Sequence, residues 1–465
     1  MWGSVIFLLL CLLLFIAILL LSCFRDRTTA ALGHLAWRIR RRLRFWLYLP
    51  QGGSERPQLI CKPSTLAHYL LQHCGSLGRP CTPDWPWLDP HLQTLCSLVW
   101  PLAGSEIDFA RDNLQLRDGG IVALDWAVGV TIRNWKATGP SSSSSPPVLI
   151  IIPNSWGRLT PHVLGLCRLA LEQGFYPVVF HRRGQGGCPL VTPSVQQFGD
   201  PSDLMEAVSY IRFRHPSAAL LAVSEGSGSG LLLSYLGECG SSSYLTCAAC
   251  ISPVFRGQQW FESPLPWLYR WALLLYQKLN LCRYSTALSE VMDTHRLFSC
   301  TSLQQFEELQ FCTGGTGKQS SLNWESYWER NEPLRDADEV AVPVLCLCSW
   351  DDPIRGDPRT TLPLELFETS PFFLLALTHW GGHCGFQKES GHGDSGTHFW
   401  SQAVLMEYFR VVAEFFRAEE RRSQGRGPPP RRRTSTLLPR RRRGTLQRDP
   451  PATDDIFNWH RSYTR

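Results

Sequence analysis

Short apolar runs rich in β-branched residues alternate with longer amphipathic stretches through the middle of this chain. A strand that is covered on both faces carries apolar residues without alternation, so each run is typical of a buried parallel strand. The runs lie at residues 148–152, 176–180, 219–223, 248–251, 344–348 and 372–377. Stretches such as 161–173 and 202–213 have the periodicity of helices. The alternation predicts an α/β fold with a doubly wound, mostly parallel sheet.

One interval in this alternation is much longer than the others. Residues 255–340 are rich in Trp and Leu and are mostly helical in pattern. We interpret them as a helical cap, or lid, inserted over one edge of the sheet. The alternative interpretation is a packing excursion that covers no site.

The chain begins with an apolar run, residues 2–24, that contains no charged residue. These 23 residues are enough to cross the hydrocarbon core of a bilayer. Seven arginines follow within residues 25–44, and arginine-rich flanks stay preferentially in the cytosol. We predict that residues 1–24 form a single-pass membrane anchor and that the body faces the cytosol, as at the endoplasmic reticulum. A cleaved signal peptide on a secreted or lumenal protein is the alternative.

Charge is divided unevenly along the chain. Of the net charge of +6, residues 25–44 contribute +6 and residues 421–465 contribute +10, which leaves −10 for residues 45–420. An acidic body with two basic ends does not fit a nucleic-acid-binding protein. A basic stretch beside an apolar segment predicts contact with a membrane surface instead. We therefore interpret residues 25–79 as a basic amphipathic linker.

The last stretch, residues 417–465, lacks periodicity and combines three consecutive prolines with two arginine blocks. Such a composition predicts a disordered tail. Ser435, Thr436 and Thr445 closely follow arginines, so they are candidate phosphorylation sites, and each phosphate would cancel about two positive charges. We interpret the tail as a docking element tuned by phosphorylation, with a solvated charge run as the alternative.

Cysteine usage agrees with a reducing compartment. The 17 cysteines are odd in number and have no framework spacing. The sequence has no metal-ligand spacing and no complete nucleotide-binding fingerprint. We therefore predict neither a metal nor a cofactor.

The five residues from Ser224 to Gly228, Ser-Glu-Gly-Ser-Gly, lie between a predicted strand and an apolar helix. A strand, a tight turn and a helix form the nucleophile elbow of many serine hydrolases, written G-x-S-x-G. The residues two before and two after its tip must be small, because the strand and helix backbones nearly touch there. This condition places Gly226 at the tip, so that a glycine stands where a hydroxyl is needed.

Ser227 and Ser229 are the alternative nucleophiles. With Ser227 at the tip, the flanking residues are Glu225 and Ser229, and with Ser229 they are Ser227 and Leu231. Both registers are less favourable sterically, but the glycine-rich run is flexible enough to present either hydroxyl.

An acid and a histidine follow the predicted elbow, each after a predicted strand. Asp351-Asp352-Pro353 comes after the strand 344–348, and His383 lies in a glycine-rich loop after the strand 372–377. The order of elbow, acid and histidine is that of this class of hydrolase. In such a site the histidine accepts the proton of the nucleophile and the carboxylate orients the histidine.

Several motifs together resemble the AB hydrolase 4 family, whose members are membrane-anchored lipid-ester hydrolases and acyltransferases. The resemblance covers roughly residues 80–415 and implies an α/β-hydrolase domain over residues 80–416. Its marks are Asp89 to Thr94, Asp118 to Gly120, Leu124 to Trp126, Arg182 to Gly187, Leu231 to Gly237, Asp351 to Pro353 and Gly381 to Phe386.

The resemblance also implies roles for individual residues. In the family the acid immediately before proline orients the histidine, which gives this role to Asp352, with Asp351 in reserve, and the role of base to His383. The family's oxyanion loop, H-G-x-x-G, aligns with the segment that ends at Gly157, and only this glycine matches. The oxyanion and pocket residues that the alignment implies are Asn154, Ser155, Gly157 and Ser227.

Two functions compete for this sequence. The first is a catalytically impaired α/β-hydrolase that acts as a membrane-bound scaffold or regulator in lipid metabolism, in lipolysis-type signalling. It would hold a lipid or acyl ligand and contact a cytosolic protein through the cap or the basic tail. The second is an active serine lipid-ester hydrolase or acyltransferase that uses Ser227 or Ser229 with His383 and Asp352. Losing a serine nucleophile costs several orders of magnitude in rate, which favours the first.

Overall fold

The computed structural model describes residues 56–79, 81, 89–99, 107–128, 145–155, 157, 159–263, 265–312, 322–387, 399–425 and 459–463. The chain divides into two units, residues 1–54 and 55–465, and all described residues belong to the second. The predicted membrane anchor and the three phosphorylation candidates lie outside the described residues. Within the described ranges, no helix combines the length and the apolar character needed to cross a bilayer.

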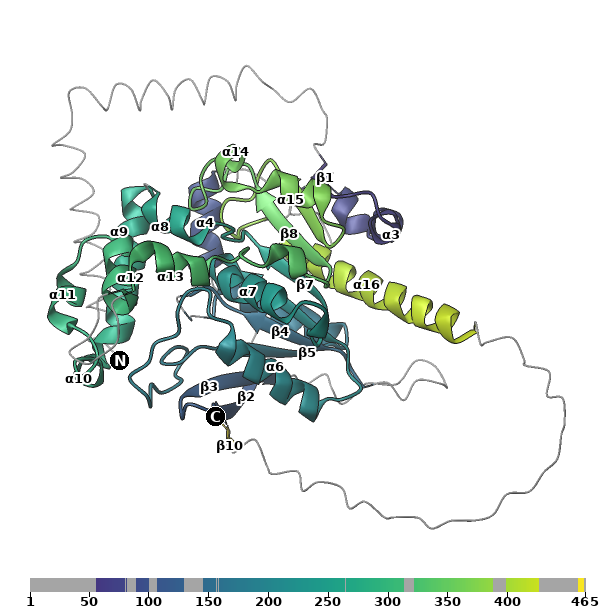
Figure 1. Ribbon diagram of the computed structural model, residues 1–465. Coiled ribbons are helices and arrows are strands. Elements are labelled where there is room, and N and C mark those ends of the chain that lie inside the picture. The colour runs from purple at the N-terminus through teal and green to yellow at the C-terminus, as the bar shows by residue number, and fades with distance from the viewer. Residues whose placement is uncertain are drawn as a thin grey trace, which may run out of the picture. The chain divides into compact units, whose positions relative to one another are not determined.

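A twisted sheet forms the centre of the protein (Figure 1). Its strands follow the order β1-β9-β8-β7-β6-β4-β5-β3-β2-β10. The six neighbouring strands from β9 to β5 pair in parallel, and the strands at both ends pair antiparallel. The strands are β1 (Gln58–Ile60), β2 (Asp108–Gln115), β3 (Ile121–Val128), β4 (Val148–Ile152), β5 (Tyr176–His181), β6 (Leu220–Glu225), β7 (Leu245–Ile251), β8 (Val344–Ser349), β9 (Phe373–Thr378) and β10 (Trp459–Tyr463).

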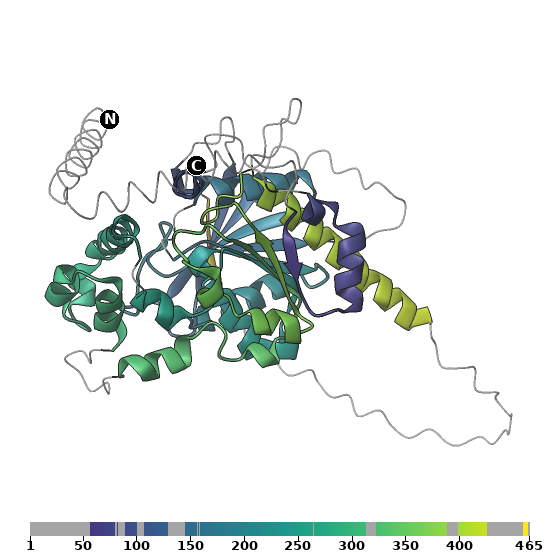
Figure 2. The same cartoon turned by 90° about the horizontal axis from the view of Figure 1, so that it is seen from above.

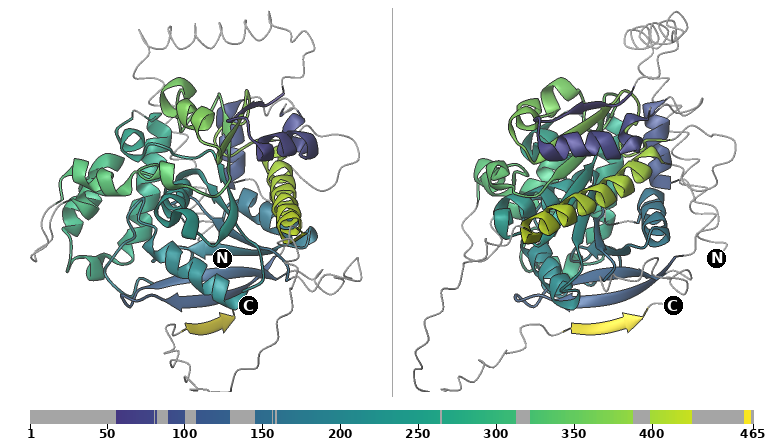
Figure 3. Two further views of the ribbon diagram at one scale, coloured as in Figure 1. Left: turned by 45° about the vertical axis from the view of Figure 1, so that its right-hand side comes forward. Right: turned by 90° about the vertical axis from the view of Figure 1, so that its right-hand side faces the viewer.

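Helices cover both faces of this sheet, because the central strands are apolar on both sides. On one face α6, α7 and α15 pack over a shared core. On the other face α3, α5 and α16 do the same, and Figure 3 shows α3 lying beside α16. These helices are α3 (Thr65–His73), α5 (Pro161–Glu172), α6 (Ser202–Arg214), α7 (Ser229–Cys239), α15 (Leu364–Thr369) and α16 (Trp400–Gly425). The doubly wound, mostly parallel α/β fold predicted from the sequence is thus confirmed.

A helical insertion between β7 and β8 gathers at one side of the sheet (Figure 2). It has its own aromatic core, in which Trp260, Phe306, Tyr327 and Trp328 pack together and against Phe198 of the body. The insertion occupies the range 255–340, for which the sequence favours either a cap or a packing excursion, and we refer to it as the cap. Its helices are α8 (Gly257–Glu262), α9 (Trp267–Cys282), α10 (Ser285–Leu288), α11 (Thr294–Ser299), α12 (Leu303–Phe311) and α13 (Trp324–Asn331).

The folded unit begins earlier than the sequence analysis predicts. Residues 56–79 belong to the stretch 25–79 that the sequence predicts as a basic amphipathic linker, yet β1 pairs with β9 and α3 buries Leu66, Ala67 and Leu70 in the core of the sheet. These elements are short, so their apolar positions give a weak signal until β9 and α16 complete their environment. The described part of the expected linker is therefore part of the domain.

The C-terminal boundary also differs from the sequence prediction of a disordered stretch over residues 417–465. Helix α16 continues to Gly425, since the residues after position 416 are mostly good helix formers even though they lack an apolar stripe. Strand β10 pairs antiparallel with β2. The intervening residues 426–458 lie outside the described part of the chain.

Candidate active site

The turn between β6 and α7 has the geometry of a nucleophile elbow with Gly226 at its tip. Gly226 is buried and has a φ of 53°, in the left-handed region that glycine adopts without strain. A Cβ on Gly228 would lie 2.3 Å from the backbone oxygen of Pro153, which belongs to the chain just after β4. No side chain fits there, so the residue two positions after the tip must be glycine. This close approach fixes the register of the turn.

The imidazole of His383 faces the tip of this elbow. A Cβ built on Gly226 would lie 2.9 Å from His383 Nε2. On the other side of the ring, His383 Nδ1 lies 2.9 Å from Asp352 Oδ2 and 3.2 Å from Oδ1. The structure therefore brings Asp352, His383 and Gly226 into the order of a catalytic triad, with a hydrogen atom in place of the nucleophilic side chain.

Asp352 is held as a buried carboxylate. Its Oδ1 accepts hydrogen bonds of 2.9 Å from the backbone N–H groups of Ile354 and Arg355. Burial alone would raise the pKa of Asp352, but the charge and hydrogen bond of His383 and the charge of Arg355 lower it. Burial alone would lower the pKa of His383, and the negative charge of Asp352 raises it well above its ordinary value. The two groups thus stabilise each other as an ion pair.

The neighbouring acid, Asp351, has a different role. Its Oδ1 accepts a hydrogen bond of 2.9 Å from the backbone N–H of Gly382, next to the histidine. Its Oδ2 is buried without a hydrogen-bond partner among the described residues, and burial raises the pKa of Asp351 to about 6. Asp351 therefore holds the histidine loop, while Asp352 contacts the imidazole.

Helix α4 (Pro90–Val99) supports the same loop from the opposite side. The backbone N–H of His383 donates to Thr94 Oγ1 at 2.9 Å, and Ser97 Oγ donates to the carbonyl of His383 at 3.3 Å. Asp89 caps the start of this helix by accepting from the backbone N–H of His91. Asp89 to Thr94 is one of the motifs that mark the family resemblance, and the sequence alone indicates no role for it. Its role here is to position the histidine.

The two candidate serines of the elbow are engaged away from the imidazole. Ser227 Oγ lies 2.6 Å from Ser155 Oγ and accepts a hydrogen bond of 3.0 Å from the backbone N–H of Ser155. Ser229 Oγ is fully buried and accepts a hydrogen bond of 2.9 Å from the backbone N–H of Val254. Within the described part of the chain, neither hydroxyl has a hydrogen bond with His383. The structure therefore does not bring Ser227 or Ser229 to the base.

The loop after β4 lies at the position of an oxyanion loop, and its donors are occupied. The backbone N–H of Ser155 is directed at the Ser227 hydroxyl, as described above, instead of at an open position beside the tip. Gln185 Nε2 donates to the carbonyl of Ser155 at 2.8 Å, and the Gln185 side chain fills the space where a Cβ on Gly157 would lie. Asn154 borders the tip, with its Cβ 3.8 Å from a Cβ built on Gly226. Gln185 holds this loop, a role that the sequence analysis missed.

A buried polar network lies directly behind the tip and was also missed. Thr160 Oγ1 donates to the carboxylate of Glu225 at 3.1 Å, and Glu225 Oε1 lies 3.3 Å from His162 Nδ1. His162 Nε2 lies 2.8 Å from Ser401 Oγ. Glu225 immediately precedes Gly226, so this network anchors the strand that presents the elbow. Its partners are about 65 to 240 positions apart in sequence, which explains why no local pattern indicated it.

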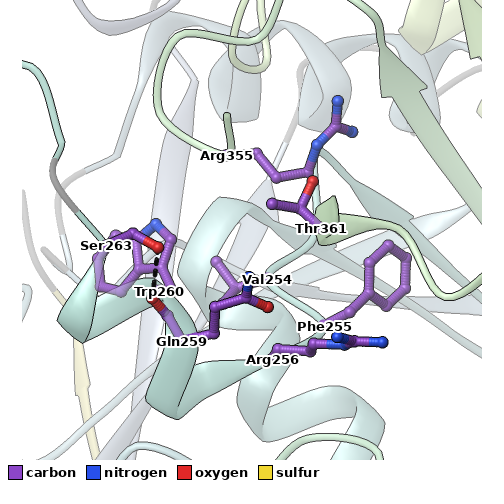
Figure 4. A pocket seen from close by; sticks show the side chains of 8 residues that line it. All are labelled: Val254, Phe255, Arg256, Gln259, Trp260, Ser263, Arg355 and Thr361. Carbon is purple, nitrogen blue, oxygen red and sulfur yellow. Dashed lines mark hydrogen bonds between the residues drawn. The ribbon is translucent and has the colours of Figure 1, made fainter. Parts of the chain in front are cut away.

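A small cavity lies where the cap leaves the body, beside the loop after β8 (Figure 4). It measures about 20 Å³, which is room for about one water molecule and too little for an acyl chain. The residues that line the cavity are Val254, Phe255, Arg256, Gln259, Trp260, Ser263, Arg355 and Thr361.

Within the described residues, no cluster of three or more His, Cys, Asp or Glu side chains could hold a metal ion.

Known proteins similar to this chain include proteins named as lipases and proteins whose names state no activity. Over 426 residues the chain is 55% identical to Protein ABHD15 of Homo sapiens, which covers 90% of this chain and 86% of that protein. It is 28% identical to Phospholipase ABHD3 of Homo sapiens, over 72% of this chain and 80% of that protein. It is 24% identical to Monoacylglycerol lipase ABHD2 of Danio rerio, over 70% of this chain and 79% of that protein.

Among solved structures, the Pyrococcus furiosus esterase Pf2001 matches with a TM-score of 0.37 and 12% identity, over 61% of this chain and 88% of that chain. Puromycin hydrolase matches with a TM-score of 0.39 and 14% identity, over 68% of this chain and 41% of that chain. No family model matches the chain. The identity to Protein ABHD15 over most of both sequences is sufficient, and the chain belongs to the AB hydrolase 4 family of α/β-hydrolases.

Proposed function

We propose that this protein is a membrane-bound α/β-hydrolase relative without a hydrolytic nucleophile, which binds a lipid or acyl ligand and acts as a scaffold or regulator in lipid metabolism. The observation that carries the proposal is Gly226 at the tip of the elbow, with His383 Nε2 2.9 Å from the position of the missing Cβ. The lipid class is supported by relatives named as a phospholipase and a monoacylglycerol lipase.

Two losses would lower the rate of nucleophilic attack on an ester. Removing the serine of a serine hydrolase costs about 10⁶-fold in rate. Part of the residual rate of such a variant comes from the oxyanion donors, and here the backbone N–H of Ser155 donates to Ser227 Oγ instead. Both the attacking atom and one stabilising donor are therefore absent from the positions that the reaction requires.

Retention of the acid and the histidine has an explanation that needs no catalysis. Asp352 and His383 join the loops after β8 and β9 through a buried ion pair. Removing one partner would leave a buried charge or an unsatisfied polar group, which is costly whether or not a reaction takes place. Their presence supports the hydrolase ancestry of the site and leaves the proposal of an inactive protein intact.

The intact acid–base pair also favours a second candidate, an active serine hydrolase or acyltransferase. In this case Ser227 would leave Ser155 and turn toward the imidazole, and the backbone would supply the oxyanion donor. The hydrogen bonds from Ser155 stand against this movement. Ser229 is a weaker candidate, because its hydroxyl satisfies a buried backbone N–H.

Labelling with a fluorophosphonate probe separates the two candidates. We expect labelling of the wild type no higher than background and labelling of Gly226→Ser at least about 10²-fold above background, since the new hydroxyl lies beside His383. Adding Ser227→Ala should increase the labelling further, because the Ser155 N–H is then released. His383→Ala in the Gly226→Ser background is the control and should abolish it. Wild-type labelling that disappears in Ser227→Ala, but not in Ser229→Ala, would establish the active enzyme instead.

Membrane attachment through residues 1–24 and cytosolic exposure of the body belong to the same proposal. They are supported by the uncharged apolar run and the arginines that follow it. The basic C-terminal stretch, with Ser435, Thr436 and Thr445 after arginines, is proposed as a docking element for a cytosolic protein. A pull-down with and without residues 426–458, combined with phosphate mapping by mass spectrometry, tests this role.

A further inference from the structure

The outer face of cap helix α9 exposes an apolar stripe. Four large apolar side chains occur at every fourth position, a spacing that places them along one side of a helix. Their exposed fractions are 51% for Trp267, 51% for Trp271, 39% for Leu275 and 58% for Leu279. Large apolar side chains that gather in this way mark a surface that contacts another apolar phase.

The opposite side of α9 is firmly packed. Leu273 and Leu274 are buried in the aromatic core of the cap. Lys278 Nζ donates to the carbonyl of Phe298 at 2.8 Å, so the helix is also tied to the end of α11. The exposed stripe is therefore a fixed feature of a folded helix, since the inward face already supplies its packing.

The charged side chains of α9 and of the turn that follows it have one sign. The stretch from Pro266 to Ser289 contains Arg270, Lys278 and Arg283 and no acidic residue. Lys278 is bound to carbonyl groups as described above, whereas Arg270 and Arg283 are exposed. Exposed tryptophan and leucine together with arginine on one helix are typical of a segment in the interfacial region of an anionic bilayer.

We propose that the outer face of α9 lies in the interfacial region of an anionic phospholipid bilayer. The proposal rests on the membrane attachment proposed above, which would hold the body close to such a surface. A second copy of the chain is a poorer occupant, because a two-fold contact through this face would bring the exposed arginines of α9 close to those of the other copy.

This placement would connect the bilayer with the candidate site. Tyr269 projects from α9 toward α4, where its hydroxyl lies 2.8 Å from His91 Nδ1 and the two rings stack 5.7 Å apart. Helix α4 in turn holds the backbone N–H of His383 through Thr94. A helix that lies on lipid thus borders the elements that position the imidazole, which suits a ligand drawn from the membrane.

Photo-crosslinking of the full-length protein in vesicles tests the proposal. The vesicles contain phosphatidylcholine with or without phosphatidylserine, together with a phosphatidylcholine that carries a diazirine in its acyl chain. After illumination and digestion, mass spectrometry locates the labelled peptides. We expect labelling in residues 1–44 and in residues 267–282, and more labelling of the second segment when phosphatidylserine is present.

A combined Trp267→Glu, Leu275→Glu and Leu279→Glu variant should lower labelling of residues 267–282 by about tenfold and leave residues 1–44 unchanged. Phe213→Glu on α6 and Leu71→Glu on α3 change other exposed apolar side chains and should have no effect. An unchanged melting temperature shows that each variant is folded.

The outcomes separate the two proposals. Labelling restricted to residues 1–44 overturns the docking of α9 and leaves membrane attachment standing, whereas labelling at neither segment overturns both. Protein–protein crosslinks between copies at residues 267–282, in place of lipid labelling, would assign the stripe to a second copy and overturn the proposal.

Discussion

The turn after β6 and the loops after β8 and β9 meet at one site, but they have kept different parts of its chemistry. The two loops hold a complete acid–base pair, Asp352 and His383, in a buried network. The turn holds a glycine where the reaction needs an oxygen. The pair contributes to packing and charge balance even without a reaction, while the nucleophile of such an elbow contributes only to catalysis. An intact pair is therefore a weaker sign of activity than an intact elbow.

Two glycines of the elbow sharpen this comparison, since only one of them is required by packing. Gly228→Ala places a Cβ 2.3 Å from the backbone oxygen of Pro153, which cannot move without distorting β4. We expect a loss of about 4 kcal/mol of unfolding free energy. Gly226→Ala meets the end of the His383 side chain at 2.9 Å and a left-handed φ, so we expect a loss of about 1 kcal/mol.

Thermal and urea unfolding of the two variants measure this difference. A larger loss for Gly226→Ala than for Gly228→Ala would show that the tip of the elbow lies elsewhere. The same result would reopen Ser227 as a nucleophile.

The acid–base pair is tested by two substitutions of Asp352. Asp352→Ala leaves His383 and the N–H groups of Ile354 and Arg355 without their acceptor, and we expect it to lower the unfolding free energy by about 3 kcal/mol. Asp352→Asn keeps an oxygen for both N–H groups and should cost about 1 kcal/mol. Urea unfolding at constant pH gives both values. Equal losses in the two variants would contradict a role of the carboxylate oxygen in capping this loop.

The sequence predicts the parallel strands, the helical pattern of residues 255–340 and the steric register of the elbow, because these depend on local apolar runs and on small residues at short spacing. It does not predict the β2–β3 hairpin, whose first strand, Asp108–Gln115, is largely polar. It also misses the contact between Glu225 and His162, which is buried behind the elbow. The partners of such networks lie on separate elements, so only the assembled fold brings them together.

The two adjacent carboxylates are distinguished by their opposite pKa shifts. Asp351 has a pKa raised to about 6, above its value of about 3.9 in the unfolded chain. The native state then binds the proton more tightly, so this residue lowers stability as pH rises from about 4 to 6, by about 3 kcal/mol in total. Asp352 has a lowered pKa, so its contribution is present above about pH 4 and is lost as pH falls below that value.

Urea unfolding of the wild type and of Asp351→Asn between pH 4 and pH 8 tests this assignment. We expect the variant to gain stability relative to the wild type as pH rises from about 4 to 6, because the asparagine keeps the oxygen that accepts from Gly382 and carries no charge to bury. Above about pH 6.5, which is the pKa of histidine in the unfolded chain, both proteins should lose stability together. The protonated imidazole of His383 stabilises the folded state, and this stabilisation is lost as pH rises toward the raised pKa of His383 in the folded protein. A difference that stays constant across the whole range would mean that the pKa of Asp351 is the same in the folded and the unfolded chain, which would contradict a pKa raised by burial.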